Sequence, residues 1–98
     1  MSTSEDVVQA VTAELETLFP GQYAVSLHPD ERSRDDVHFL VVSRADSERG
    51  AVFALDTEVL EERGPAEAAR RLSDQMARVI RQELPTRQGG VYIGYDAT

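Results

Sequence analysis

The sequence predicts a two-layer α+β domain in the order α-β-β-β-α, with a three-stranded antiparallel sheet packed by two helices. Apolar residues recur at the spacing of a helix face near the start of the chain and again in its second half. Between these segments lie three short stretches with strand patterning, separated by polar turns. A chain of 98 residues suffices for one hydrophobic core. We therefore place residues 1–88 in a single α+β domain.

The first helix is predicted over residues 4–19. Glu5 and Asp6 fall in its first turn, where the helix dipole favours negative charge. Pro20-Gly21 ends the helical pattern. Its apolar face comprises Val7, Val8, Val11, Leu15, Leu18 and Phe19.

Three strands are predicted next. Residues 22–28 alternate between larger apolar side chains and small or polar ones, which is typical of a strand with one buried face. A polar, charged connection over residues 29–36 follows. Residues 37–42 and 51–55 form the other two strands, joined by a hairpin-type loop at residues 45–50.

The second and third strands are apolar on both faces. Successive strand residues point to opposite sides of a sheet, so one face carries Val37, Phe39, Val41, Phe53 and Leu55. The other face carries Leu40, Val42, Val52 and Ala54. Two helices fill only one face of a short sheet, so we expect the second face to be buried by self-association or by a partner.

The second helix is predicted to begin at Gly64-Pro65, because proline is favoured in a first turn, and to end at Pro85. Its buried stripe comprises Ala69, Leu72, Met76, Val79, Ile80 and Leu84. Phe39 and Phe53 should pack against Leu72 and Met76 together with Val11 and Leu15. Residues 89–98 form either a flexible tail or a short edge strand, because 91–95 have strand chemistry that Gly94 weakens.

Charge is unevenly distributed along the chain. The formal net charge is −8, and all ten basic residues are arginines. From Pro65 to Arg87, however, five arginines and three acids give a local charge of +2. Three of these arginines, Arg70, Arg78 and Arg81, lie along one line of the predicted helix, and we call them the arginine ridge. The ridge could contact an acidic partner, although Glu67 and Asp74 stand at ion-pair spacing within the helix.

The predicted order of elements resembles, in outline, that of double-stranded RNA-binding domains and of small acidic dimeric secretion chaperones. RNA-binding domains of that kind carry lysines where the second helix begins, and this chain has Gly64-Pro65-Ala66-Glu67 there. Nucleic-acid binding through the arginine ridge is therefore an alternative that the net charge disfavours.

A second alternative is a metal site or a metal-dependent enzyme. His28 and His38 flank a loop rich in carboxylates, and a hairpin would bring both histidines to one face together with Asp36. The spacing matches no established ligand motif, so we expect neither a metal nor another cofactor. No phosphate-binding loop, nucleophile elbow or His-Glu-x-x-His occurs.

The sequence thus predicts a non-enzymatic, acidic protein-interaction or regulatory domain, which acts as an adaptor or chaperone. We expect a homodimer through Leu40, Val42, Val52 and Ala54, and a protein partner at the arginine ridge. Because the N-terminus lacks the features of a signal peptide and no apolar run approaches membrane length, we expect a cytoplasmic protein without membrane contact.

Overall fold

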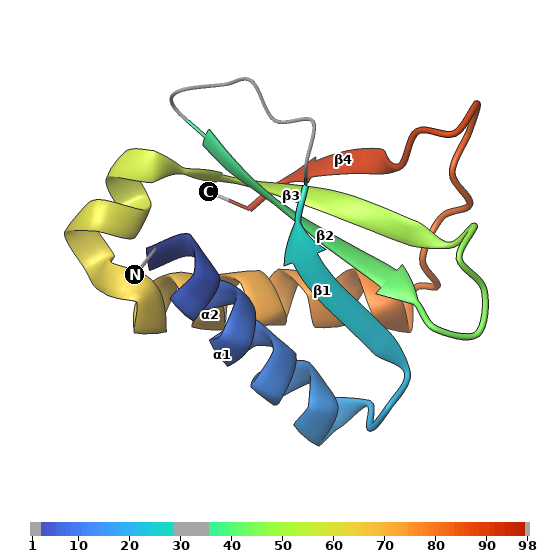
Figure 1. Cartoon of the computed structure of the whole chain (residues 1–98), viewed down its shortest axis with the longest axis horizontal. Coiled ribbons are helices and arrows are strands. Elements are labelled where there is room, and N and C mark those ends of the chain that lie inside the picture. The colour runs from blue at the N-terminus through green and yellow to red at the C-terminus, as the bar shows by residue number, and fades with distance from the viewer. Residues whose placement is uncertain (1–2, 29–35, 98) are drawn as a thin grey trace.

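The computed structural model describes residues 3–28 and 36–97, which form two helices and a four-stranded mixed sheet (Figure 1). In chain order the elements are α1 (Thr3–Leu18), β1 (Tyr23–Leu27), β2 (Asp36–Ser43), β3 (Gly50–Asp56), α2 (Thr57–Arg81) and β4 (Ile93–Asp96). No helix in the described ranges is long and apolar enough to cross a membrane.

The strands lie in the sheet in the order β1-β2-β3-β4. The first three are antiparallel, as the sequence predicts, and Phe39 lies opposite Phe53. The fourth strand pairs in parallel with β3, so the edge-strand alternative for the C-terminal segment is the one that the structure adopts. A parallel pair needs a crossover connection, and α2 supplies it between β3 and β4.

Helix α1 covers the sheet with one apolar stripe. Val7, Val11 and Leu15, spaced by four residues, are almost completely buried. The helix ends at Leu18, close to the predicted boundary, and the turn that follows has Gly21 at φ 68°. Glycine adopts such a positive φ without steric cost, so Pro20-Gly21 reverses the chain into β1.

The sequence prediction missed a helical segment that precedes the predicted start of the second helix. Helix α2 already begins at Thr57, where the Asp56 side chain accepts a hydrogen bond of 2.8 Å from the Glu58 backbone N–H. Residues 57–63 are helical, and the chain kinks at Gly64, which has φ 83° and ψ 167°. Glu61 and Glu62, which precede the predicted helix start, therefore lie on a helix. The longer helical segment begins after this kink at Pro65, as the sequence predicts, and the additional segment follows β3 without a connecting loop.

The end of α2 also differs from the prediction. The helix ends at Arg81 and Gln82 caps it, whereas Leu84 lies beyond the helix and is still buried. Glu83 adopts a positive φ of 81°, which turns the chain away from the helix axis. The predicted stripe thus identified Leu84 as a core residue but placed it in the wrong element.

One hydrophobic cluster lies between the helices and the sheet, and it contains all six residues that the sequence predicts to pack together. Phe39, Phe53, Leu72 and Met76 are at most 1% exposed. The ring of Tyr95 on β4 stacks on Phe53, with centroids 5.2 Å apart and planes at 16°. This contact attaches the C-terminal strand to the core.

Both helices lie on the same side of the sheet (Figure 1). The buried side chains of β2 and β3 that face them are Phe39, Val41, Ala51, Phe53 and Leu55. In the described part of the chain no helix or strand covers the opposite side, which we call the open face, and the Tyr92 ring lies on it at Gly50.

Truncating Phe53 to alanine should destabilise the domain by about 3–5 kcal/mol, because it leaves a cavity beneath Leu72 and removes the stacking partner of Tyr95. Denaturant titration measures this loss. Val91→Ala is the matched control: Val91 is 68% exposed, so its truncation should change stability by less than about 0.5 kcal/mol. A loss below about 1 kcal/mol for Phe53→Ala would contradict the core described here.

Candidate functional site

The centre of the open face is apolar. Leu40 lies opposite Val52, Val42 opposite Gly50, and His38 opposite Ala54. Neighbouring strands add small residues, since Ala24, Ser26 and Gly94 pair with positions on this face. We call Leu40, Val42, Val52 and Ala54 the apolar centre. The structure thus brings together the four residues that the sequence assigns to an interface.

The side chains of the apolar centre are only partly exposed. Val52 is 9% exposed, and the other three are half-buried. The centre is therefore an apolar strip with little exposed side-chain surface. A flat apolar strip on a pleated sheet suits packing against another flat surface.

One end of the open face is acidic. Asp36 opens β2, Asp56 closes β3 and Asp96 closes β4, and all three carboxylates line one shallow depression of about 410 Å³. His38, Val52, Ala54, Gly94 and Tyr95 complete its lining. We call Asp36, Asp56 and Asp96 the acidic end.

The two histidines lie together beside the acidic end. The backbone N–H of His28 donates to the His38 carbonyl at 3.0 Å, which continues the β1–β2 ladder. Burial lowers the pKa of the His38 imidazole below its usual 6.5, and the nearby charge of His28 lowers it further. Both effects favour a neutral His38.

This arrangement gives no support to the predicted metal alternative. In residues 3–28 and 36–97, no group of three histidine or carboxylate side chains is placed to hold a metal ion. The remaining carboxylates of the predicted loop, Asp30, Glu31 and Asp35, lie outside the described residues. His28, His38 and Asp36 are thus neighbours on one face without forming a coordination site among themselves.

At the opposite end of the face, the β2–β3 hairpin is tied to the segment before β4. The Tyr92 hydroxyl donates to the Ser47 carbonyl at 2.6 Å, and its ring lies against Gly50. Arg87 forms an ion pair with Glu48 and lies 5.5 Å from the Tyr92 ring centroid. Arg49 donates to the Leu84 carbonyl at 2.9 Å. These contacts hold the segment that leads into β4 against the hairpin.

Arg44 also lies at the hairpin end. It follows β2 at a position that continues the alternation of Leu40 and Val42, and its side chain is exposed. Its Nε donates to the Tyr23 carbonyl at 3.2 Å. No carboxylate of the described residues forms an ion pair with Arg44, which distinguishes it from Arg49 and Arg87 nearby.

The residues of the arginine ridge are exposed on α2, as the sequence predicts, but two of them pair within their own helix. Arg70 forms an ion pair with Glu67 at 3.0 Å, and Arg78 with Asp74 at 3.6 Å. Exposed pairs of this kind contribute little to stability, but they reduce the positive charge that the ridge offers to a phosphate backbone or an acidic partner.

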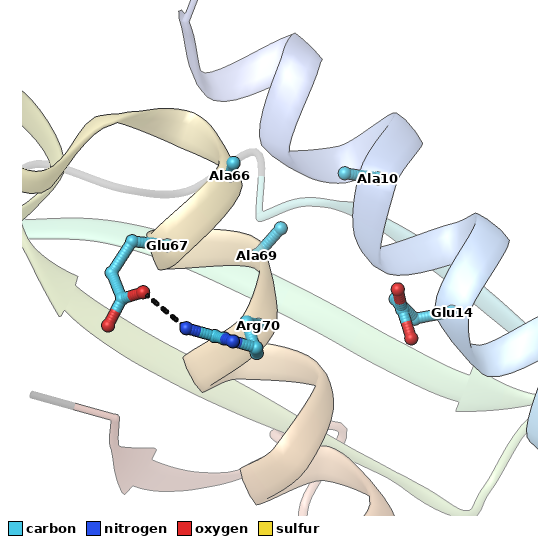
Figure 2. Close-up of a pocket in the computed structure, with 6 residues that line it drawn as sticks. All are labelled: Ala10, Glu14, Ala66, Glu67, Ala69 and Arg70. Atoms are coloured by element: carbon cyan, nitrogen blue, oxygen red, sulfur yellow. Dashed lines mark hydrogen bonds and ion pairs between the residues drawn. The ribbon is translucent and has the colours of Figure 1, made fainter.

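A shallow depression of about 440 Å³ lies between the two helices (Figure 2). Three alanines from both helices, Ala10, Ala66 and Ala69, form its apolar part. Glu14 on α1 and the Glu67–Arg70 pair on α2 lie around it. The small side chains leave this hollow where the helices approach each other, and no sequence motif marks it.

Sequence reasoning missed two features of the open face. Asp96 joins the acidic end only because β4 pairs in parallel with β3, and Tyr92 reaches Gly50 only because the segment after α2 returns to the hairpin. Both depend on a contact between residues far apart in the sequence. The only local indication of β4 was the strand-like composition of residues 91–95.

Comparison of the chain with protein-family models, with curated proteins and with solved structures finds no match.

Stability should fall as the pH drops below 6.5, because the unfolded chain then binds a proton that the folded chain resists at His38. This part of the stability is fully present above 6.5 and decreases until the pH passes the lowered pKa of the folded state. Urea unfolding on both sides of 6.5 measures the slope, and His38→Gln should flatten it. Equal slopes in the variant and the original chain would exclude this role of His38.

Replacing Gly50 with alanine should destabilise the hairpin end by about 1–3 kcal/mol. A Cβ atom there would lie 2.8 Å from both the Tyr92 ring and the Val41 carbonyl oxygen, so the ring or the backbone must shift. Gly94→Ala is the matched control, because a Cβ at Gly94 meets nothing within 4 Å. Thermal unfolding compares the two, and equal stability would refute the close packing of Tyr92.

Proposed function

We propose that this chain is a non-enzymatic protein-interaction domain that acts as a homodimer through the open face of its sheet. The observation that carries this proposal is the apolar centre, which faces away from both helices and is not covered by any element in the described ranges. Apolar side chains in the middle of a face with charged groups at its ends have the layout of a protein interface.

A weak and reversible dimer is the expected strength of this association. Six large side chains, Leu40, Val42 and Val52 from two copies, would contribute about 9–18 kcal/mol if they passed from full exposure to burial. The actual gain is smaller, since Val52 is only 9% exposed and the others are half-buried. Association itself costs about 4–15 kcal/mol, so burial of these side chains alone does not offset it, and the dimer needs further contacts on the open face.

A second copy fits the open face better than a strongly basic partner would. The acidic end occupies only one end of the face, while the apolar centre is neutral and Arg44 lies at the other end. An identical copy offers the same flat apolar strip, so the two surfaces match in shape and length. In such a dimer the helices of both copies face outward.

A protein partner of the dimer would then contact the helical layer. The depression between α1 and α2 and the arginine ridge are the features that this layer presents (Figure 2). The dimer would carry two copies of both on opposite sides, which is an arrangement suited to an adaptor or a chaperone-like protein.

Val42→Glu should convert the dimer into a folded monomer, because it places a charge in the middle of the apolar centre. Sedimentation over a range of concentrations measures the mass, and circular dichroism checks the fold. Leu18→Glu is the matched control: Leu18 lies on α1, away from the open face, and is 47% exposed. This variant should retain the concentration dependence of the original chain.

Two results would overturn the proposal. One is an original chain that stays monomeric at the highest concentration measured. The other is a folded Val42→Glu variant whose mass does not change relative to the original chain.

A further inference from the structure

Charge on the open face is segregated along the strand direction. Asp36 and Arg44 mark the two ends of β2, and each stands four residues from Leu40. Asp56 and Asp96 join Asp36 at one end, and no aspartate or glutamate from β1–β4 lies on the apolar centre between the ends. The face is thus electrically asymmetric, and β2 carries this asymmetry with Leu40 at its midpoint.

Two identical sheets can stack face to face with their strands aligned in two ways. In one, the same ends coincide, so Asp36 of one copy lies at the same end as Asp36 of the other. In the other, the two-fold axis runs across the strands, so each acidic end lies over the hairpin end of the other copy. Like charges directly opposed across an interface are strongly unfavourable.

We propose, on the basis of the homodimer inferred above, that the two-fold axis crosses β2 at Leu40 and runs across the strands. The Leu40 side chains of both copies then meet at the axis. Because Asp36 and Arg44 are equidistant from Leu40, Asp36 of each copy lies over Arg44 of the other. The two apolar centres overlap in this position. One placement therefore pairs opposite charges and also brings apolar side chains together.

The side chains can span the gap between the sheets. Packed sheets lie about 10 Å apart, and an arginine and an aspartate that extend toward each other cover roughly this distance. Arg44 is exposed, its Nε donates to the Tyr23 carbonyl, and it forms no ion pair with a carboxylate of the described residues. The hairpin loop at this end also carries Asp46 and Glu48, which form ion pairs with Arg49 and Arg87.

Charge reversal at these two positions tests the placement. Arg44→Glu and Asp36→Arg should each weaken the dimer about tenfold, because each disrupts two symmetric pairs. The double variant should recover most of the affinity. Equimolar mixing of the two single variants should give a heterodimer more readily than either homodimer, because every facing pair then has opposite charges. Sedimentation with one variant fluorescently labelled measures all four cases.

Matched controls change the net charge by the same amount as the test variants. Arg63→Glu changes the net charge by as much as Arg44→Glu, and Glu62→Arg by as much as Asp36→Arg, but both sites are exposed on α2. Neither control should change the affinity more than about twofold.

A distance measurement tests the orientation without altering the charged pair. The chain has no cysteine, so Ala45→Cys allows one nitroxide label per copy at the exposed tip of the hairpin. Ala45 is five residues from Leu40, so the axis proposed here separates the two labels by about 33 Å along the strands. If the same ends coincided, the labels would lie within about 20 Å of each other.

The outcomes separate this inference from the homodimer itself. A short label distance, or a tighter dimer with Asp36→Arg alone, would overturn the orientation while Val42→Glu still abolishes the dimer. Failure of the homodimer would appear instead as an unchanged mass in the Val42→Glu variant, with no effect of either charge reversal.

Discussion

The structure depends on one constraint: two helices must cover a sheet whose central strands are apolar on both faces. Helices α1 and α2 lie on one side, where Phe39 and Phe53 pair across the β2–β3 ladder and fill the core. This leaves Leu40 and Val52 on the side without helices. A charged or polar residue at these positions would have given a conventional sheet with one solvent-exposed polar face. The residues present instead leave apolar surface that association can bury.

The C-terminal segment completes the sheet through contacts at both of its ends. Tyr92 packs on Gly50 and binds the hairpin carbonyl of Ser47, while Tyr95 stacks on Phe53 in the core. A strand of four residues forms few ladder bonds, so these aromatic contacts supply much of what fixes its position. The absence of a side chain at Gly50 is what permits the first of them.

Local patterns were sufficient for α1, for the three antiparallel strands and for the assignment of their faces, because each depends on spacing within one segment. Long-range contacts decided the rest. Gly64-Pro65 carries a strong helix-start signal, and a helical segment does begin there, but Asp56 caps an additional segment directly after β3. The direction of β4 depends on the crossover through α2, which spacing within residues 91–95 does not encode. The four residues of the apolar centre were identified from the alternation of side chains along two strands. The acidic end was not, because it brings together residues from three strands.

The asymmetry of the open face follows from this topology. Because β2 and β3 are antiparallel, the start of one strand and the end of the other lie at the same end of the sheet, which brings Asp36 beside Asp56. Because β4 is parallel to β3, its last residue, Asp96, reaches that same end. An antiparallel β4 would have carried this carboxylate to the hairpin end, close to Arg44, and largely cancelled the difference between the two ends. The parallel crossover therefore makes the two ends of the open face different in charge. Such a face can favour one orientation over the other when it packs against its own copy.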